Sequence, residues 1–369
     1  MPESTAVLFN ANDPQLPQAH LFLESLRDEN RGAYGGDIWV LSTGLSPAGR
    51  RYVEQMNLKL LEDPLDYLRR WPGREVAQEF VLAGKPKKSP PAKAQSPPSF
   101  FTRCRSLLRR VFEGLDQTFW KKLSAKTDAA EEAGPTAAEL EECYLEFRNK
   151  RCSKLIVLKF LEDHGDDYQR VIFCDTDVLA QGPLRQVVDQ VVEDRLYYRH
   201  EENPILPGTP LWKKNFAYKT VMGAQGNGLD LGGHEINIGF LAAAPSVMWK
   251  LWNAQKELYL AEEHVGLISR GWHEQDFFRL LRAKRPEEFA LFREGTVVHT
   301  CNGGLQCIKQ VRPMMFQYAD SGLQPAMVHF AGGTWAEFKP LSATYNMDFN
   351  AFLAYYAGSA ARPARARAA

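Results

Sequence analysis

Apolar and amphipathic segments alternate along the N-terminal part of the chain. Residues 6–11, AVLFNA, and 37–44, DIWVLSTG, are apolar runs of strand length, and they predict two buried strands. A turn at Asn12-Asp13-Pro14 follows the first run, and the helix predicted after it has an apolar face made of Ala19, Phe22, Leu23 and Leu26. Ser46-Pro47 predicts a second helix, because serine is a good N-cap and proline is tolerated at the first helical position. This strand–helix alternation is typical of an α/β protein with a parallel sheet covered by helices.

The alternation is interrupted after Asp63. Residues 84–99, GKPKKSPPAKAQSPPS, are rich in proline and lysine, which is typical of flexible or extended linkers. Residues 100–123 are amphipathic at helical spacing, and arginine and lysine surround their apolar stripe. A further helix is predicted from about 140 to 163. We therefore expect 64–138 to be an insertion into one domain.

The interrupted domain is expected to comprise 1–63 and 139–357, with a basic, disordered tail at 358–369. At 369 residues, the chain suits a single large α/β domain with such an insertion. The formal net charge is zero, so no overall field attracts nucleic acid, and no nucleic-acid partner is expected. The six cysteines show no Cys-x-x-Cys pattern, which favours reduced thiols in a cytoplasmic protein over disulfides or a zinc site. Neither a signal peptide nor a membrane span is predicted.

Two aspartates, Asp175 and Asp177, follow the apolar run 171–174, VIFC, which predicts another buried strand. Carboxylates at alternate positions of a regular strand point to opposite faces, so both reach one ligand only where the backbone turns, as Gly182-Pro183 suggests. Ligands of open α/β sheets bind at the carboxyl ends of the strands. Two hard oxygen ligands suit Mg²⁺ or Mn²⁺, which would neutralise the phosphates of a substrate. The alternative is a solvated strand end without a metal.

Five segments carry further motifs in chain order. They are VLFNANDPQLPQAHLFLESL (7–26), VIFCDTDVLAQGPL (171–184), EINIGFLAAAP (235–245), WHEQDFFRLL (272–281) and MVHFAGGTW (327–335). Together they resemble glycosyltransferases of the GT-A fold, in particular glycosyltransferase family 8, which includes glycogenin and bacterial lipopolysaccharide galactosyltransferases. The resemblance covers about residues 6–340 apart from the insertion. It implies a Rossmann-like, mostly parallel central sheet flanked by helices, and transfer of a hexose from UDP-glucose or UDP-galactose.

The resemblance also implies roles for single residues. Asp175, Asp177 and His329 would be metal ligands, and a ring nitrogen among them favours Mn²⁺ over Mg²⁺. Gln275, Asp276 and Glu274 would face the transferred sugar as the catalytic group. The remaining donor contacts would be Asn12 and Asp13 at the base, Asn237 and Gly239 at a sugar hydroxyl, Arg151 and Lys154 at the diphosphate or sugar, and Gly332 along the diphosphate.

Two departures from the family pattern affect this assignment. The family usually has a lysine three residues after the glycine that corresponds to Gly332, whereas this chain has Trp335 there and its nearest lysine is Lys339. The diphosphate contact is therefore open. Glu274 stands where the family tends to have aspartate, and this longer carboxylate is consistent with a different donor sugar.

The implied chemistry is transfer with retention. A nucleoside diphosphate would leave while the metal and nearby cations stabilise its charge and the sugar gains oxocarbenium character. Inversion requires a general base near the acceptor hydroxyl, and double displacement requires a nucleophilic carboxylate near the anomeric carbon. Neither is firmly identified in the resembling family, so we favour a front-face substitution in which Gln275 supports the cationic sugar.

Each of these residues also has a purely structural interpretation. His329 and His299 can be ordinary core histidines, and His299 is expected to be one. Gln275 and Glu274 can cap the helix expected to begin at Asp276. Asn237 lies between two isoleucines, so it needs a bonded partner, which can be backbone rather than sugar.

Other classes of protein share part of the pattern. The DTDV sequence fits a haloacid-dehalogenase-like phosphatase, in which Asp175 would accept the phosphoryl group. Against this, the motif opens the domain in such phosphatases, whereas here a strand–helix–strand–helix unit precedes it. A non-catalytic nucleotide-sugar-binding protein is the third alternative, although intact Asp175, Asp177 and His329 argue against it.

The sequence indicates the acceptor substrate and the cellular location of the protein less clearly. A glycan, a lipid-linked saccharide or a protein can serve as the acceptor. The basic amphipathic segment 100–123 can pack on the main domain, or it can lie on an anionic membrane with its aromatic rings inserted. The second alternative would place the protein at the inner face of the membrane.

Overall fold

The computed structural model describes residues 4–42, 44–63, 153–205, 233–260 and 274–360, and the fold below refers to these residues. The predicted insertion 64–138, with its amphipathic segment 100–123, lies outside them. The predicted boundaries of the domain and its insertion therefore stay predictions. The last helix ends at Ala360, so its final residues fall within the segment predicted as a tail.

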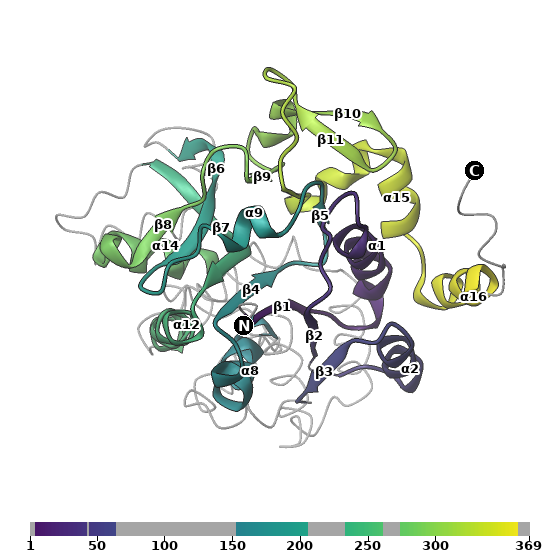
Figure 1. Ribbon diagram of the computed structural model, residues 1–369, viewed down its shortest axis with the longest axis horizontal. Coiled ribbons are helices and arrows are strands. Elements are labelled where there is room, and N and C mark those ends of the chain that lie inside the picture. Colours follow the sequence, from purple (N-terminus) through teal and green to yellow (C-terminus); the bar gives the residue numbers. More distant parts are fainter. Residues whose placement is uncertain (1–3, 43, 64–152, 206–232, 261–273, 361–369) are drawn as a thin grey trace, which may run out of the picture.

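Seven strands within the described residues form the central sheet, in the order β3-β2-β1-β4-β7-β6-β8 (Figure 1). They are β1 (Thr5–Asn10), β2 (Asp37–Ser42), β3 (Lys59–Glu62), β4 (Arg170–Cys174), β6 (Leu196–Ile205), β7 (Gly233–Ala243) and β8 (Phe289–Leu291). Neighbouring strands are parallel except for β7, which is antiparallel to β4 and β6. The predicted α/β fold with a mostly parallel sheet is confirmed.

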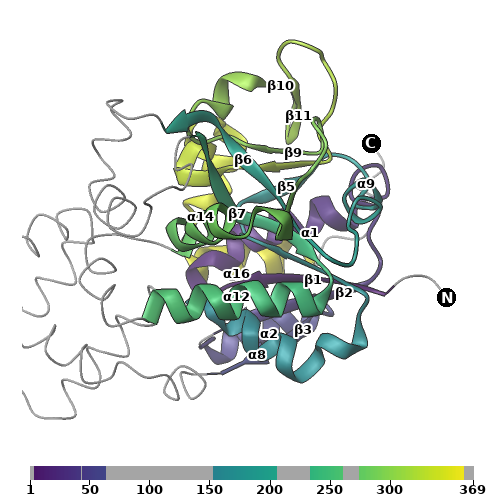
Figure 2. The same cartoon turned by 90° about the vertical axis from the view of Figure 1, so that its left-hand side faces the viewer.

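The helices cover both faces of this sheet because alternate strand residues are apolar on both sides. In β1, Ala6 and Leu8 join one core, whereas Val7 and Phe9 join the other. The first core is completed by helices α8 (Ile156–His164), α12 (Pro245–Leu260) and α14 (Glu274–Lys284), of which α8 and α12 lie side by side (Figure 2). The second is completed by α1 (Leu16–Arg27), α2 (Pro47–Gln55), α9 (Arg185–Val188) and α16 (Phe349–Ala360).

The predicted N-terminal elements are present, with small differences in their bounds. The predicted apolar face of α1 is buried, and the Ser46 Oγ accepts a hydrogen bond from the Gly49 amide at the start of α2. Strand β3 was not predicted, because it is a short edge strand with an irregular burial pattern. Among the helices of the described residues, none has both the length and the apolar character needed to cross a bilayer.

A small three-stranded sheet stands beside the central one, in the order β5-β12-β9. Its strands are β5 (Val178–Ala180), β9 (Val297–His299) and β12 (Met327–His329). A hairpin of β10 (Ile308–Arg312) and β11 (Met315–Tyr318) and the helix α15 (Lys339–Tyr345) share a third core with this sheet. The short 3-10 turns are η1 (Asp13–Gln15), η2 (Ser153–Leu155), η3 (Gly165–Asp167), η4 (Pro286–Glu288), η5 (Gly304–Cys307) and η6 (Ala331–Glu337).

The order of the strands creates a point where ligands bind in related sheets. Strand β1 has β2 on one side and β4 on the other. The strands that follow β1 in the chain are therefore added first on one side of it, as β2 and β3, and then on the other side, beginning with β4. The carboxyl ends of β1 and β4 lie next to each other, with Phe9 paired to Cys174. Such a switch point is where open α/β sheets bind their ligands. Residues 175–177, between β4 and β5, start at this point and connect the central sheet to the small sheet.

Candidate functional site

Three predicted metal ligands converge at the end of β4. Asp175, Asp177 and His329 each offer a ligand atom, and these atoms all lie within 4.8 Å of one another. The His329 Nε2 is 3.1 Å from the Asp177 Oδ1 and 3.7 Å from the Asp175 Oδ2. His329 pairs with Val178, directly after Asp177, because β12 is antiparallel to β5. The pairing of two short strands thus brings the imidazole to the carboxylates.

Backbone hydrogen bonds fix the turn that carries the aspartates. The amide of Asp175 donates to the carbonyl of Gly239 at 2.9 Å, and the amide of Phe330 donates to the carbonyl of Asp177 at 2.9 Å. The chain therefore leaves the regular strand at the aspartates themselves, before Gly182-Pro183. This departure allows carboxylates at alternate positions to reach the same place.

Lys154 supplies a positive charge to the same place. Its Nζ lies 2.6 Å from the Asp175 Oδ1 and 2.9 Å from Oδ2, and both side chains are about three-quarters buried, with 23% and 26% exposed. The lysine belongs to η2, immediately before α8. Its predicted contact with the diphosphate or the sugar stays a prediction, and Arg151 lies outside the described residues.

The charges of the site favour a cation beside the carboxylates. Burial alone would raise the pKa of Asp177, but the His329 ring and Lys154 outweigh it, and this pKa is lowered. Burial alone would lower the pKa of His329, yet the carboxylates of Asp177 and Asp175 raise it. A divalent cation would satisfy the same carboxylates. Two carboxylates with one imidazole nitrogen fit Mn²⁺ or Mg²⁺.

Gly239 makes room for the imidazole. A β-carbon built on this residue would overlap the ring of His329. Glycine is therefore needed here to leave space for the His329 side chain. The close approach of Gly239 to a sugar stays a prediction.

A second histidine, His299 of β9, contacts His329. It was expected to be an ordinary core residue, and it is fully buried, but its Nδ1 lies 2.8 Å from the His329 Nδ1. Its Nε2 lies 3.1 Å from the carbonyl oxygen of Arg199. Burial, reinforced by the neighbouring His329, moves the pKa of His299 well below its usual value, so this ring is neutral at physiological pH.

Two predicted sugar-binding residues meet at a carboxylate that was not predicted. Glu201 Oε1, on β6, accepts hydrogen bonds from the Asn237 Nδ2 at 3.1 Å and from the Gln275 Nε2 at 3.3 Å. The Asn237 Oδ1 accepts from the Gly239 amide at 2.9 Å, which connects this cluster to the metal ligands. The Cys301 thiol lies 3.5 Å from the Asn237 Nδ2. We call Glu201, Asn237, Gln275 and Cys301 the amide–carboxylate cluster.

A buried ion pair lies next to this cluster. The Arg279 Nη1, on α14, donates to the Glu235 Oε2 at 3.1 Å, and the two side chains are 1% and 4% exposed. Burial raises the pKa of Glu235, and Arg279 offsets only part of this rise, so that the pKa is about 7. The pair joins α14, which carries Gln275, to β7, which carries Asn237.

The two residues predicted at the nucleotide base make contacts within the fold. The Asn12 side-chain amide lies 2.8 Å from the Ser42 Oγ at the end of β2. The Asp13 Oδ1 accepts from the Ser46 amide at 3.2 Å, at the start of α2. Asn12 lies just beyond the carboxyl end of β1, a position that is compatible with contact to a nucleotide base. Asp13 instead supports the start of α2.

The segment after His329 contains two glycines with a left-handed backbone, and the predicted contact of Gly332 with a diphosphate stays a prediction. Gly332 and Gly333, in η6, have φ values of 69° and 79°, a region that glycine adopts without strain. Trp335, which replaces the lysine of the family pattern, packs its ring on Tyr345. Lys339 begins α15 and its side chain is exposed.

The remaining predicted residues are only partly described. The helix α14 begins at Glu274, two residues before its predicted start at Asp276. The side chains of Glu274 and Asp276 lie outside the described residues, so their predicted roles stay predictions.

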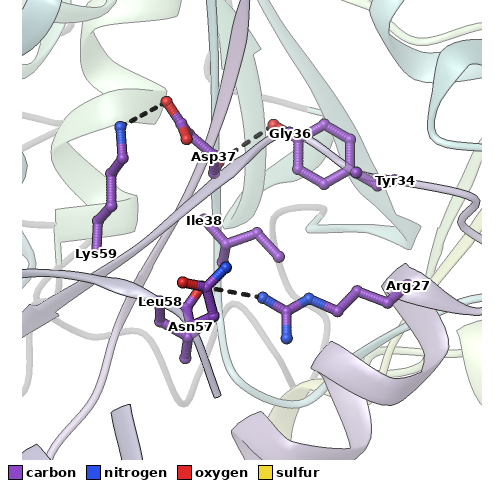
Figure 3. A pocket seen from close by; sticks show the side chains of 9 residues that line it. Arg27, Tyr34, Gly36, Asp37, Ile38, Asn57, Leu58 and Lys59 are labelled. Atoms are coloured by element: carbon purple, nitrogen blue, oxygen red, sulfur yellow. Dashed lines mark hydrogen bonds and ion pairs between the residues drawn. The ribbon is translucent and has the colours of Figure 1, made fainter. Parts of the chain in front are cut away.

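A separate hollow of about 500 Å³ lies at the opposite, amino end of β2 (Figure 3). Its polar groups bind one another. The Lys59 Nζ is 2.7 Å from the Asp37 Oδ2, and the Arg27 Nη1 donates to the Met56 carbonyl at 2.8 Å. Ligands of open α/β sheets bind at the other end of the strands, so we assign no function to this hollow.

Comparison with known proteins gives similarity in structure only. No protein-family model matches the chain, and no curated protein matches it in sequence. The apo form of mouse xyloside xylosyltransferase 1 is 12% identical, with a TM-score of 0.44 over 90% of this chain and 99% of its own. The galactosyltransferase LgtC, in complex with donor and acceptor sugar analogues, is 15% identical, with a TM-score of 0.43 over 92% of this chain and 95% of its own. Both of these proteins are glycosyltransferases by name.

Proposed function

We propose that this chain is a metal-dependent glycosyltransferase that moves a hexose from a UDP-sugar, UDP-glucose or UDP-galactose, to an acceptor hydroxyl. The observation that carries the proposal is the convergence of Asp175, Asp177 and His329 at the switch point of the central sheet. A sugar nucleotide needs a cation for its diphosphate and hydrogen-bonding groups for its sugar. The amide–carboxylate cluster offers such groups and is joined to the metal ligands through Gly239.

Asp175, Asp177 and His329 would hold Mn²⁺ or Mg²⁺, which neutralises the diphosphate and stabilises it as a leaving group. Lys154, now paired with Asp175, would add a positive charge on the same side. The left-handed backbone at Gly332 and Gly333 would let the amides after His329 approach the phosphates closely. Asn12 would contact the base beyond the end of β1, and Lys339 would be the lysine that contacts the diphosphate.

The amide–carboxylate cluster would orient the sugar. Glu201 retains acceptor capacity beyond its two amide contacts, so it can accept a hydrogen bond from a hydroxyl of the donor or the acceptor. Gln275, with Glu274 and Asp276 beside it in sequence, would face the reacting carbon. A neutral amide there is suited to supporting an oxocarbenium-like sugar without forming a bond to it, which favours front-face transfer with retention.

The acceptor is a carbohydrate, a glycolipid or a protein in this proposal. A glycolipid acceptor would give the basic segment 100–123 a role at an anionic membrane surface, and the protein would then act from the cytoplasmic side. Flotation of liposomes with the full chain and with a chain lacking 85–125 tests this role. Equal flotation of the two chains would contradict it.

Release of nucleoside diphosphate from a panel of nucleotide sugars, with and without Mn²⁺, tests the proposed reaction. We expect metal-dependent release from one UDP-hexose and its loss in Asp177→Ala. Release of phosphate from a generic phosphomonoester, with loss in Asp175→Asn, would instead favour a phosphatase. Binding of a UDP-sugar without turnover in the presence of acceptors would favour a non-catalytic binding protein.

A further inference from the structure

His299 contacts the candidate metal centre from a neighbouring strand. Strands β9 and β12 are parallel, and His299 pairs in register with His329, so both side chains lie on the same side of the small sheet. Their Nδ1 atoms are 2.8 Å apart, and the two rings meet edge to face with an interplanar angle of 84°. The pairing of strands therefore produces a direct contact between two imidazoles.

The surrounding acceptors determine which ring nitrogens carry protons. The His299 Nε2 lies 3.1 Å from the Arg199 carbonyl oxygen, which can only accept, so this nitrogen is the donor. Where the His329 Nε2 binds a metal, the proton of that imidazole lies on its Nδ1, and the facing Nδ1 of His299 is the nitrogen placed to accept it. The other nitrogen of His329, Nε2, is the one that faces Asp177 and Asp175.

This proton arrangement is the one that a metal-binding histidine needs. A neutral imidazole binds a metal through its unprotonated nitrogen, and the bond made by its other nitrogen fixes the tautomer and the ring orientation. Gly239 constrains the same ring sterically, because a β-carbon there would overlap it. Gly239 thus acts on the position of the His329 ring, and His299 acts on the proton of its Nδ1.

We propose that His299 is a positioning residue of the metal centre, which accepts the Nδ1 proton of His329 and so keeps the His329 Nε2 available toward the two carboxylates. The inference rests on the metal-dependent function proposed above and adds a residue that need not touch the metal or the donor. The hydrogen-bonded chain runs from the Arg199 carbonyl on β6 through His299 to His329. It predicts an effect on metal affinity that packing alone would not produce.

Two variants of similar shape separate positioning from packing. His299→Asn keeps a side-chain oxygen that can accept the Nδ1 proton of His329, whereas His299→Leu has no acceptor. We expect Mn²⁺ alone to bind His299→Leu roughly 10- to 100-fold more weakly than the wild type, the usual loss for an outer-shell partner. His299→Asn should retain most of the affinity. The electron paramagnetic resonance signal of free Mn²⁺ gives the dissociation constants.

If His299→Leu binds Mn²⁺ as tightly as the wild type does, or if both variants lose the same affinity for Mn²⁺, the inference about His299 is wrong. The proposed metal-dependent function would not be affected by that result. Failure of the wild type to bind Mn²⁺ would overturn the proposed metal-dependent function together with it. If neither variant folds, ¹⁵N NMR of the imidazoles in the wild-type protein with Mg²⁺ gives the answer, with His329 identified by its loss in His329→Gln. A proton on the His329 Nδ1 is expected, and a proton on Nε2 with a bare Nδ1 would overturn the inference.

Discussion

At the residue scale, the side chains of the site have little rotational freedom because each is held by a specific neighbour. The His329 ring lies against the Gly239 backbone and bonds to His299. The Glu201 carboxylate is held by the amides of Asn237 and Gln275. Such fixed geometry means that changes of single atoms should have measurable effects on metal affinity or on transfer.

Substitution of Gly239 tests the steric part of this arrangement. In Gly239→Ala, the added methyl overlaps the His329 ring, so we expect the free energy of unfolding to fall by about 1–3 kcal/mol and Mn²⁺ affinity to fall with it. Urea denaturation and Mn²⁺ titration measure the two effects. Gly165→Ala is a matched control, since its methyl would make an ordinary contact with the Pro245 Cβ at 3.5 Å. Similar behaviour of the two variants would contradict the proposed fit.

Substitution of Glu201 separates sugar orientation from metal binding. We expect Glu201→Gln to bind Mn²⁺ as the wild type does but to lose roughly 10- to 100-fold in kcat/KM, because a hydrogen bond to a charged group contributes about 1.5–3 kcal/mol. Glu202→Gln is the control, since Glu202 is paired with Arg199, at 3.4 Å, and makes no contact with Asn237 or Gln275 among the described hydrogen bonds. Equal losses in both variants, measured by steady-state kinetics, would argue against the assignment.

Some residues of the site could be identified from the sequence and others could not, because their contacts are determined in different ways. Asp175, Asp177 and His329 could be predicted because they belong to short motifs at strand ends. His299 and Glu201 could not, because their partners are set by the register of β9 on β12 and of β6 on β7, between segments far apart in the chain. Polar residues within strand-like segments, such as RHEEN before Pro204, were the available signal for Glu201.

At the element scale, two contacts hold the strands and helices that carry the site. The turn between β4 and β5 is fixed to β7 and β12 by backbone hydrogen bonds of Asp175 and Asp177. Helix α14 is joined to β7 by the buried pair of Arg279 and Glu235. The first contact positions the metal ligands, and the second sets Gln275 relative to Asn237.

The buried pair predicts a pH dependence of stability. The folded-state pKa of Glu235, about 7, lies above its ordinary value of 4.5, so between these values the folded protein keeps a proton that the unfolded chain has released. The free energy of unfolding should therefore fall as pH rises from about 4.5 to 7, by at most about 3 kcal/mol at 1.36 kcal/mol per pKa unit. Urea denaturation across this range, compared with Glu235→Gln, measures the contribution. The variant should have the flatter profile, and parallel profiles would contradict the prediction.

At the scale of the whole molecule, the site lies at the junction of two sheets. Asp175 follows β4 of the central sheet, whereas His329 ends β12 of the small sheet. Strands β1, β2 and β4 of the central sheet could be predicted from their apolar runs, and β7 from the family resemblance, whereas β3, β6 and β8 were not predicted. The small sheet could not be predicted, because three-residue strands are too short to show a period, and their pairing depends on distant parts of the chain.

A metal ion at this junction should stabilise the whole fold. At a free Mn²⁺ concentration 100 times the dissociation constant, binding to the folded state alone adds about 2.7 kcal/mol, so the unfolding temperature should rise. Asp177→Asn should abolish this rise by removing a ligand charge. Differential scanning calorimetry with Mn²⁺ and with a chelator measures it. The same rise in the variant would place the stabilising ion elsewhere.

The central claim is that Asp175, Asp177 and His329 together bind one divalent cation beneath the diphosphate of a sugar nucleotide. Anomalous diffraction at the manganese absorption edge, from crystals grown with Mn²⁺ and UDP, tests it most directly. The predicted map has a single strong peak in contact with all three side chains and with the diphosphate. A bound diphosphate without that peak, or a manganese peak away from these residues, would contradict the claim.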